Sequence, residues 1–383
     1  ESLTCELFGA HKLLQDIKKL ENKNIKVVPG PCMGRCNVAP TVCVGKNYVD
    51  VANFDKVKKT IDEKNFDPFI PDYINLSSYK KKGGYEIANK IKNGVISKKQ
   101  VLDSLNESGL KGKGGAGFPT GKKWEIVSNY NGKKYVAVNG DEGEPGTFKD
   151  RSYLESDPHR FLEGALIASY FINAHKVYIY MRDEYPAVIK ILLDEINKME
   201  DEEIIPKDFF IVRRGAGAYI CGEESAMIES IEGKRGLPRH RPPYVAEIGL
   251  FGCPTLTNNL ETLFWVRDII EKGAKWFAEK GSNGNKGFHS FSVSGRVKNP
   301  GVKVAPAGIT IQQLIDEYCD GMADGHTFKG YLPGGASGGI LPATMNDIPL
   351  DYGSKELMDA GCFLGSAAVV VLSDHDNMKD VAL

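Results

Sequence analysis

Short apolar segments that alternate with helix-patterned segments constrain the fold of this chain more than any other feature. KYVAVN, KVYIYM and FFIVRR read as buried strands. Between them, the stretches Phe161 to Phe171 and Ala187 to Met199 carry apolar residues at helical spacing. Strands that alternate with helices favour a parallel sheet with helices on both faces. The sequence therefore predicts an α/β core.

Polar, glycine-containing stretches follow two of these strands directly. VNGDEGEPG follows the first strand, and GAGAYICGEESAM follows the third. Ligands of open α/β sheets collect at the carboxyl ends of the strands, so both stretches are candidate binding loops. Solvated charge, helix capping and metal binding remain alternatives for the carboxylates. No histidine accompanies them, and the nearby glycines favour a nucleotide. The carboxylates would then accept hydrogen bonds from hydroxyl and amide groups of that nucleotide. The carboxylates concerned are Asp141, Glu142, Glu144, Glu223 and Glu224.

A glycine-rich stretch, GLKGKGGAGFPTG, runs from Gly109 to Gly121. Its backbone N–H groups can form a concave nest for phosphate oxygens. It satisfies the pattern G-x-G-x-x-G, but the usual dinucleotide loop follows a strand. Here VLDSLNES precedes it and reads as a helix that ends at Gly109. A flexible surface loop is the alternative, and the Phe-Pro pair followed by Lys-Lys-Trp disfavours it.

The chain contains eight cysteines, and in a chain of this length a disulfide framework is not expected. Metal ligation and inert burial are the two remaining interpretations. Cys32 and Cys36 stand in a C-x3-C loop between an expected strand, IKVV (25–28), and an expected hairpin made of VCVG and NYVDV. Their thiolates can converge on iron there, with Cys5 as a further candidate ligand. Cys43 lies within the hairpin and is expected to be a core residue. Helices are expected over 11–23 and 53–64.

Composition excludes some functions. With 383 residues, 42% hydrophobic residues, 26% charged residues and a net charge of −1, the chain has an ordinary globular composition. Two to three domains are expected at this length. A nucleic-acid partner would need a basic surplus, which is absent. The longest apolar run, Cys362 to Leu372, is too short to cross a bilayer. We expect a cytoplasmic protein with no direct membrane insertion, and no signal peptide is recognisable.

Further motifs carry a family resemblance. NNLET (258–262) lies in TLTNNLETLFWV, which reads as a loop that becomes a helix. EGKRGLPRHRPPY, SFSVSGRVKNPGVKVAPAGITIQQLIDEYC and GYLPGGASGGILPA also stand in the second half. Together with the loops above, they resemble the flavin- and NADH-binding subunit shared by respiratory complex I, bidirectional NAD-linked hydrogenases and NAD-dependent formate dehydrogenases. They are most similar to the β (diaphorase) subunit of the molybdenum- or tungsten-containing formate dehydrogenases. The resemblance covers nearly the whole chain.

The resemblance implies an activity and a partner. The chain would transfer hydride between NAD(H) and FMN, and single electrons between FMN and iron–sulfur clusters. Its partner would be a molybdopterin-containing formate dehydrogenase α subunit. One alternative is the same NADH:FMN module in complex I or a bidirectional hydrogenase. Another is a non-enzymatic electron-transfer scaffold without flavin.

The resemblance also implies site residues, with no catalytic nucleophile or acid–base side chain among them. Lys123 would neutralise the flavin phosphate, Phe118 and Tyr244 would stack on adenine, and Glu144 and Glu224 would orient the ribose or nicotinamide. Ile126 stands where some members have an aromatic residue, so stacking is expected to be one-sided. FMN would be held by Gly112, Gly114, Lys123, Asn139, Asp141, Glu142, Gly222, Glu223, Asn258, Asn259 and Thr262, and NAD(H) by Phe118, Glu144, Glu224, Arg241 and Tyr244.

The resemblance divides the chain into parts. Residues 1–62 resemble a thioredoxin-like [2Fe–2S] domain with Cys5, Cys32 and Cys36 as ligands; its first ligand would fall just before Glu1, so this domain is expected to be truncated at its start. Residues 63–108 would be a connector and helices, 109–282 a Rossmann-like FMN/NAD(H) domain, and 283–350 a small β-grasp-like (SLBB) domain. Residues 351–383 would lead into a helical domain whose [4Fe–4S] cluster is expected beyond Leu383. The GGASGG turn either binds a ligand or, as we favour, serves packing.

Overall fold

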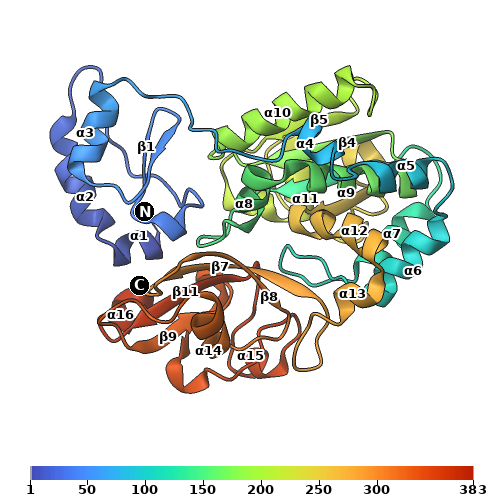
Figure 1. Ribbon diagram of the computed structural model, residues 1–383. Helices are drawn as coiled ribbons and strands as arrows, with labels where there is room; N and C mark the ends of the chain where they lie inside the picture. The colour runs from blue at the N-terminus through green and yellow to red at the C-terminus, as the bar shows by residue number, and fades with distance from the viewer. Residues whose placement is uncertain (1, 383) are drawn as a thin grey trace. The chain divides into compact units, whose positions relative to one another are not determined.

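The structure is a computed structural model that describes residues 2–382 (Figure 1). The chain divides into two compact units. The first unit comprises the chain up to Phe69, the short segment Glu144–Lys149, and the chain from His289 onward. The second unit comprises Ile70–Gly143 and Asp150–Phe288. The predicted division into five parts follows other boundaries and stays a prediction.

A four-stranded parallel sheet forms the centre of the second unit, with strand order β5-β4-β3-β6. Its strands are β3 (Tyr135–Gly140), β4 (Lys176–Met181), β5 (Phe210–Arg214) and β6 (Thr255–Asn259). All three pairings are parallel. The three predicted strands and the predicted parallel sheet are confirmed, and the fold is α/β.

Alternate residues of these strands face two different apolar cores, which is why helices lie on both sides of the sheet. Val136 and Val177 pack into the larger core, together with α9 and α12. Tyr135 and Tyr178 pack into a smaller core on the other face, together with α11. The helices of this unit are α4 (Leu76–Lys80), α5 (Glu86–Lys92), α6 (Lys98–Ser108), α7 (Thr120–Ser128), α8 (Lys149–Ser156, which begins at the last residue of the Glu144–Lys149 segment), α9 (Pro158–Ile172), α10 (Pro186–Asp201), α11 (Glu224–Ile231), α12 (Leu260–Lys272) and α13 (Ala274–Ala278).

Buried polar groups attach the segment before the glycine-rich stretch to this core. Glu163 of α9 is fully buried and accepts hydrogen bonds from the Tyr79 hydroxyl (2.6 Å) and the Tyr85 backbone amide (2.9 Å). His159, also fully buried, bonds the Tyr85 hydroxyl (2.7 Å) and Glu195 of α10 (2.7 Å). A buried charge is tolerated only when such donors satisfy it. These hydrogen bonds therefore fix the segment around Tyr79 and Tyr85, within the predicted connector and helices of 63–108, against α9.

Two sequence predictions of local structure are wrong. TLTNN was expected to be a loop that becomes a helix, but it is strand β6, paired in parallel with β3. Its alternation of threonine and leucine suits a buried strand, and the short segment gave no separate signal. The expected strand at 25–28 is not formed. Only Ile25 makes an isolated bridge, to Asn22.

The N-terminal part of the first unit is small. Its elements are α1 (Leu3–Leu7), α2 (Ala10–Ile17), β1 (Val42–Val44), β2 (Asn47–Val49) and α3 (Phe54–Asp62). The predicted hairpin is confirmed, because β1 and β2 pair antiparallel. The predicted helix at 53–64 is also confirmed, with the Asn53 side chain capping its first turn. Ile17, Val49 and Val57 lie in the core between the two helices and the hairpin.

The C-terminal part of the first unit contains a mixed sheet with strand order β10-β9-β11-β7-β8. Its strands are β7 (Phe288–Gly295), β8 (Gly301–Pro306), β9 (Phe328–Leu332), β10 (Leu341–Pro342) and β11 (Ala368–Ser373). β11 runs parallel to β7 and antiparallel to β9. Short helices accompany the sheet, namely α14 (Ile311–Gln313), a π-helical turn (Leu314–Tyr318), α15 (Lys355–Asp359) and α16 (Met378–Ala382). Within residues 2–382, none of the helices combines the length and the apolarity that crossing a bilayer requires.

Candidate functional site

The carboxyl ends of the four parallel strands meet along one edge of the sheet in the second unit. Asn139 at the end of β3 is in register with Asn259 at the end of β6. Asp141 and Glu142 follow β3 within two residues of its end, and the loop from Gly215 to Glu223 follows β5. The structure therefore brings most of the residues predicted for cofactor binding to this edge, as the rule for open α/β sheets leads one to expect.

The glycine-rich stretch is anchored against the same edge. Helix α6 ends at Gly109, whose φ of 70° is the left-handed conformation that glycine adopts most easily. The loop closes on itself, because the Gly112 amide donates to the Phe118 carbonyl oxygen (2.8 Å). The Lys113 amide donates to the Thr262 hydroxyl (2.9 Å). A Cβ at Gly114 would lie 3.2 Å from the Cβ of Asn259. The stretch thus lies directly over the end of β6, which does not fit a freely moving surface loop.

Glu224 lies in a polar cluster on the first turn of α11. Its Oε2 accepts from the Thr257 hydroxyl (2.7 Å) and from Lys123 Nζ (3.2 Å), and its Oε1 lies 3.4 Å from Arg241. Burial alone would raise the pKa of Glu224, but the attraction of Lys123 and the hydrogen bond from Thr257 outweigh it and lower this pKa. Glu224 is therefore a carboxylate with fixed orientation at neutral pH.

Glu223 caps the same helix. Its Oε2 accepts from the backbone amides of Ser225 (2.9 Å) and Ala226 (3.0 Å), and its Oε1 pairs with Arg241. The Asn139 amide group donates to the Gly222 carbonyl oxygen (2.8 Å) and so joins this loop to the end of β3. Helix capping, one of the alternatives considered for these carboxylates, is what Glu223 does in this structure.

Asp141 is the most unusual carboxyl group of the site. It is 2% exposed, and burial raises its pKa to about 7, with a smaller opposing effect from Arg182. Its Oδ2 lies close to Gly143 in the loop after β3 and to Gly222 in the loop after β5. A Cβ added at Gly143 would be 2.8 Å from this oxygen, and one added at Gly222 would be 3.4 Å from it. Glycine at 143 leaves the space in which this carboxyl lies. A buried carboxyl with a strongly raised pKa at a strand end is a typical mark of a functional site.

Glu142 has a structural position. Its carboxylate accepts from the backbone amides of Asp150 (2.7 Å) and Arg151 (3.1 Å) in the first turn of α8, and from the Tyr185 hydroxyl (2.8 Å). Arg182 donates to its backbone carbonyl oxygen (2.9 Å). Sequence reasoning missed Arg182 and Tyr185, although Arg182 directly follows β4 and the strand-end rule could have found it.

The two asparagines at the end of β6 are held by neighbours from other elements. Asn258 is buried, and its Oδ1 accepts from the Trp124 indole N–H (2.9 Å). Asn259 donates to Asp150 (2.7 Å), and its Oδ1 accepts from the Glu261 amide at the start of α12 (3.0 Å). Trp124 was not predicted as a site residue, and its place in the Lys-Lys-Trp stretch after the glycines was the available signal.

The residues predicted to hold NAD(H) fall into two groups. Four of them, Phe118, Glu224, Arg241 and Tyr244, belong to the second unit. There the Phe118 and Tyr244 side chains are 43% and 57% exposed, as stacking residues in an open site would be. Glu144 belongs to the first unit. There its Oε1 accepts from the Ser337 amide (2.8 Å) in the GGASGG turn, so this turn packs against Glu144.

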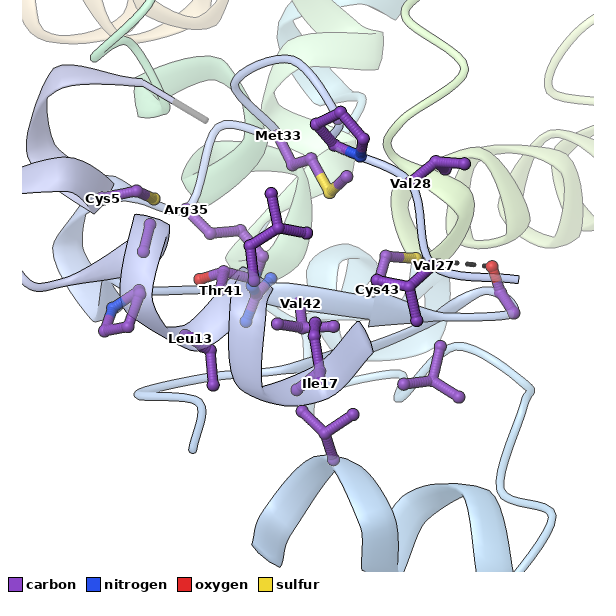
Figure 2. A pocket seen from close by; sticks show the side chains of 18 of the residues that line it. Cys5, Leu13, Ile17, Val27, Val28, Met33, Arg35, Thr41, Val42 and Cys43 are labelled. Atoms are coloured by element: carbon purple, nitrogen blue, oxygen red, sulfur yellow. Dashed lines mark hydrogen bonds between the residues drawn. The ribbon is translucent and has the colours of Figure 1, made fainter. Parts of the chain in front are cut away.

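The three cysteines predicted as metal ligands line one cavity of about 550 Å³ in the first unit. Cys32 and Cys36 are buried, and their Sγ atoms are 3.5 Å apart. They pack against Phe148, which belongs to the same unit. Figure 2 shows Cys5 on the wall of this cavity, where Arg35 and Met33 are labelled nearby. The hydrogen bond with Cys32 and burial raise the pKa of the Cys36 thiol well above its usual value. Cys43 is half-buried in β1 and lines the same cavity.

The sequence and the fold both match known proteins. Residues 105–268 match the Nuo51 FMN-binding domain family. The NADH-quinone oxidoreductase F 2 subunit of Rhizobium meliloti (strain 1021) is 42% identical over 322 residues, which cover 82% of this chain and 76% of that protein. The NADH-quinone oxidoreductase F subunit of Aquifex aeolicus (strain VF5) is 41% identical over 321 residues, covering 82% and 73%.

A solved structure extends the likeness to the whole chain. A chain in the crystal structure of an NAD+-reducing [NiFe]-hydrogenase in the air-oxidized state superposes with a TM-score of 0.84 and 27% identity, covering 99% of this chain and 68% of that one. The fold is shared with this chain of an NAD+-reducing hydrogenase. The chain belongs to the family of the Nuo51 FMN-binding domain and the NADH-quinone oxidoreductase F subunits.

Proposed function

We propose that this chain is an NADH-oxidising FMN module of a multi-subunit redox complex, with FMN and NAD(H) held at the strand-end edge of the second unit. The observation that carries the proposal is the meeting of the anchored glycine loop, the asparagines of β6 and the buried Asp141 at that edge. Family membership supports the same cofactors, because the matching family is an FMN-binding domain.

The residues present fit a flavin mononucleotide. A backbone loop that lacks Cβ atoms at Gly112 and Gly114 can approach a phosphate closely. Lys123 Nζ donates to Glu224 and Thr257, and an ammonium has three N–H donors, so one more can serve a phosphate oxygen. Asp141 offers a buried carboxyl. Hydrogen-bond donors of a ligand would offset the cost of removing this carboxyl from water.

The chain contributes position and electrostatics rather than acid–base chemistry. Bound FMN would supply the exchange of hydride with NAD(H) and of single electrons with iron–sulfur clusters. Arg241 forms ion pairs with Glu223, a proposed FMN ligand, and with Glu224, a proposed NAD(H) ligand. These pairs hold both carboxylates in place for hydrogen bonds from hydroxyl and amide groups of the ligands. Phe118 and Tyr244 offer exposed aromatic faces for an adenine.

Cys5, Cys32 and Cys36 are the proposed ligands of a [2Fe–2S] cluster. All three line the same cavity, and the Cys32 and Cys36 sulfurs are 3.5 Å apart, which supports this assignment. Clusters of this type take four cysteine ligands in most proteins. The remaining ligand, which is the first in chain order, and the [4Fe–4S] cluster stay predictions that fall outside residues 2–382.

The partner subunit is a separate question. The named relatives are subunits of NADH-quinone oxidoreductases, and the similar structure is an NAD+-reducing hydrogenase, so complex I or hydrogenase partners have the better support. A formate dehydrogenase α subunit stays a prediction that rests on the motifs of the second half. Affinity purification of the natively expressed protein, followed by identification of its bound subunits and a formate-dependent NAD+ reduction assay, separates these partners.

The proposed activity is tested on the purified protein with NADH and an artificial electron acceptor such as ferricyanide. We expect turnover that is lost when flavin is removed and is restored by FMN. A Gly114→Val variant should fail to recover activity, because its side chain would meet Asn259 under the loop. An equally active Gly114→Val protein would contradict the placement of FMN at this loop.

A further inference from the structure

Two histidines and an aspartate lie together at the end of the β9–β11 strand pair in the first unit, and none of the three belongs to the sites described above. They are His326, which precedes β9, and Asp374 and His375, which follow β11. One ligand atom from each lies within 4.8 Å of the other two. Asp374 and His375 are exposed and His326 is partly exposed. Figure 1 shows β9 and β11 side by side at the C-terminal, red end of the chain.

The sheet holds this group in place. β9 and β11 are antiparallel, with Ser373 in register with Phe328 after an irregularity at Leu372/Ser373. The Asp374 amide donates to the Thr327 carbonyl oxygen (3.0 Å), and the Thr327 amide donates to Asp374 Oδ1 (2.8 Å). These bonds fix the Asp374 carboxylate and leave its second oxygen for another partner.

A buried hydrogen-bond network fixes the tautomer of His326. Ser373 is fully buried, and its hydroxyl donates to Asp376 Oδ2 (3.2 Å), whose carboxylate is paired with Arg296 (2.8 Å). With its only hydrogen used in this way, the Ser373 oxygen is an acceptor for His326 Nδ1, 2.8 Å away. His326 then carries its proton on Nδ1, so Nε2 keeps a lone pair.

An imidazole whose second nitrogen donates to a neighbouring oxygen is the usual state of a metal-bound histidine. We propose that His326, Asp374 and His375 bind one divalent transition-metal ion of the zinc class, with water at the remaining position. Two imidazole nitrogens and one carboxylate oxygen are ligands that zinc accepts, whereas calcium and magnesium prefer all-oxygen sites. The ion would link the segment that follows β11 to the segment that precedes β9.

The test uses the intact protein with its cofactors loaded and Zn2+ alone as the probe. Protein is dialysed against buffered Zn2+, and bound zinc is counted per chain by elemental analysis. We expect one equivalent fewer in His326→Ala and in His375→Ala than in the unaltered protein. His175→Ala, at an exposed histidine of the second unit, is the matched control and should lose none. Counting differences between variants cancels any zinc bound by cysteines.

A further variant tests the role of Ser373 as a positioning residue. Ser373→Ala removes the acceptor for His326 Nδ1 but no ligand, and loss of such a partner weakens metal binding about 10- to 100-fold. NADH oxidation should be unchanged in all these variants, which serves as the folding check. If Ser373→Ala does not fold, the zinc content of His375→Ala, at an exposed residue, still tests the metal site. Equal zinc content in the unaltered protein and in both histidine variants, or an equal loss in His175→Ala, would overturn the proposal.

Discussion

Replacing Asp141 by asparagine should stabilise the flavin-free protein, and the gain should grow with pH. Asp141 is 2% exposed, and burial raises its pKa from 3.8 to about 7 despite the attraction of Arg182. Below pH 4 the carboxyl is protonated in both the folded and the unfolded protein, so it contributes no pH-dependent penalty. Between pH 4 and 7 the unfolded protein releases this proton while the folded protein keeps it. The resulting destabilisation grows over this window and is complete above pH 7.

The magnitude follows from the size of the pKa shift. Each unit corresponds to about 1.4 kcal/mol, so the full penalty is about 4 kcal/mol at pH 8 and below about 2 kcal/mol at pH 5. The difference between the two pH values, about 2–3 kcal/mol, is the diagnostic quantity. Any fixed cost of burying the asparagine amide is the same at both pH values and cancels.

The assay is urea unfolding of the flavin-free Asp141→Asn protein and the unaltered protein at pH 5 and pH 8. Asp103→Asn, at an aspartate on the surface of α6, is the matched control, and the effect of Asp141→Asn is taken as the difference from it. Equal effects of Asp141→Asn at the two pH values would refute the reasoning. A larger stabilisation at pH 5 than at pH 8 would refute it as well.

The same substitution should weaken FMN binding. We propose that Asp141 accepts a hydrogen bond from the flavin at pH 8, where its carboxyl is ionised. A hydrogen bond to a charged group contributes about 1.5–3 kcal/mol, which is about tenfold or more in affinity. Asp141→Asn would therefore improve stability and impair cofactor binding, a combination that a purely structural residue does not show. The FMN dissociation constant, measured by flavin fluorescence quenching, checks this outcome.

Three further predictions concern other parts of the molecule. Cys36→Ser should abolish the iron–sulfur EPR signal of the reduced protein and leave FMN content unchanged, whereas Cys43→Ser, at a residue that lines the same cavity, should retain the signal. Gly164→Ala should lower the free energy of unfolding in urea by about 1–3 kcal/mol or more, because the added Cβ would lie 1.9 Å from the Leu263 carbonyl oxygen where α9 crosses α12; an unchanged free energy would contradict this packing. Glu195→Gln should cost about 2–3 kcal/mol at pH 7. Burial opposes ionisation of Glu195, but donors from histidine, lysine, backbone and tyrosine outweigh it and lower the pKa of Glu195 to about 2. The cost of Glu195→Gln should therefore shrink as pH falls below 4.5 toward 2. A cost that stays constant with pH would contradict this account.

Sequence periodicity predicted the second unit well because β3 and β4 are almost entirely buried and β5 begins with three apolar residues before its two exposed arginines. The helices between these strands carry apolar residues at helical spacing. β6 escaped prediction because TLTNN is short and ends in two asparagines. It becomes a strand because it pairs with β3, which is distant in the sequence, and local propensity does not predict such long-range pairing.

The site was predictable where a residue follows a strand, and unpredictable where a side chain finds its partner through the fold. The strand-end rule pointed to Asp141 and Glu223. It could not show that Glu142 would cap α8, since the amides it binds become neighbours only when the chain turns back. The raised pKa of Asp141 likewise comes from burial, which a sequence of consecutive carboxylates does not reveal.

The central claim is tested most directly by the absorption spectrum of the anaerobically purified protein before and after addition of NADH. The account predicts bound flavin that bleaches with NADH and does not bleach with NADPH or with formate alone. A protein that binds no flavin even after incubation with FMN, or whose bound FMN keeps its colour with excess NADH, would contradict the account.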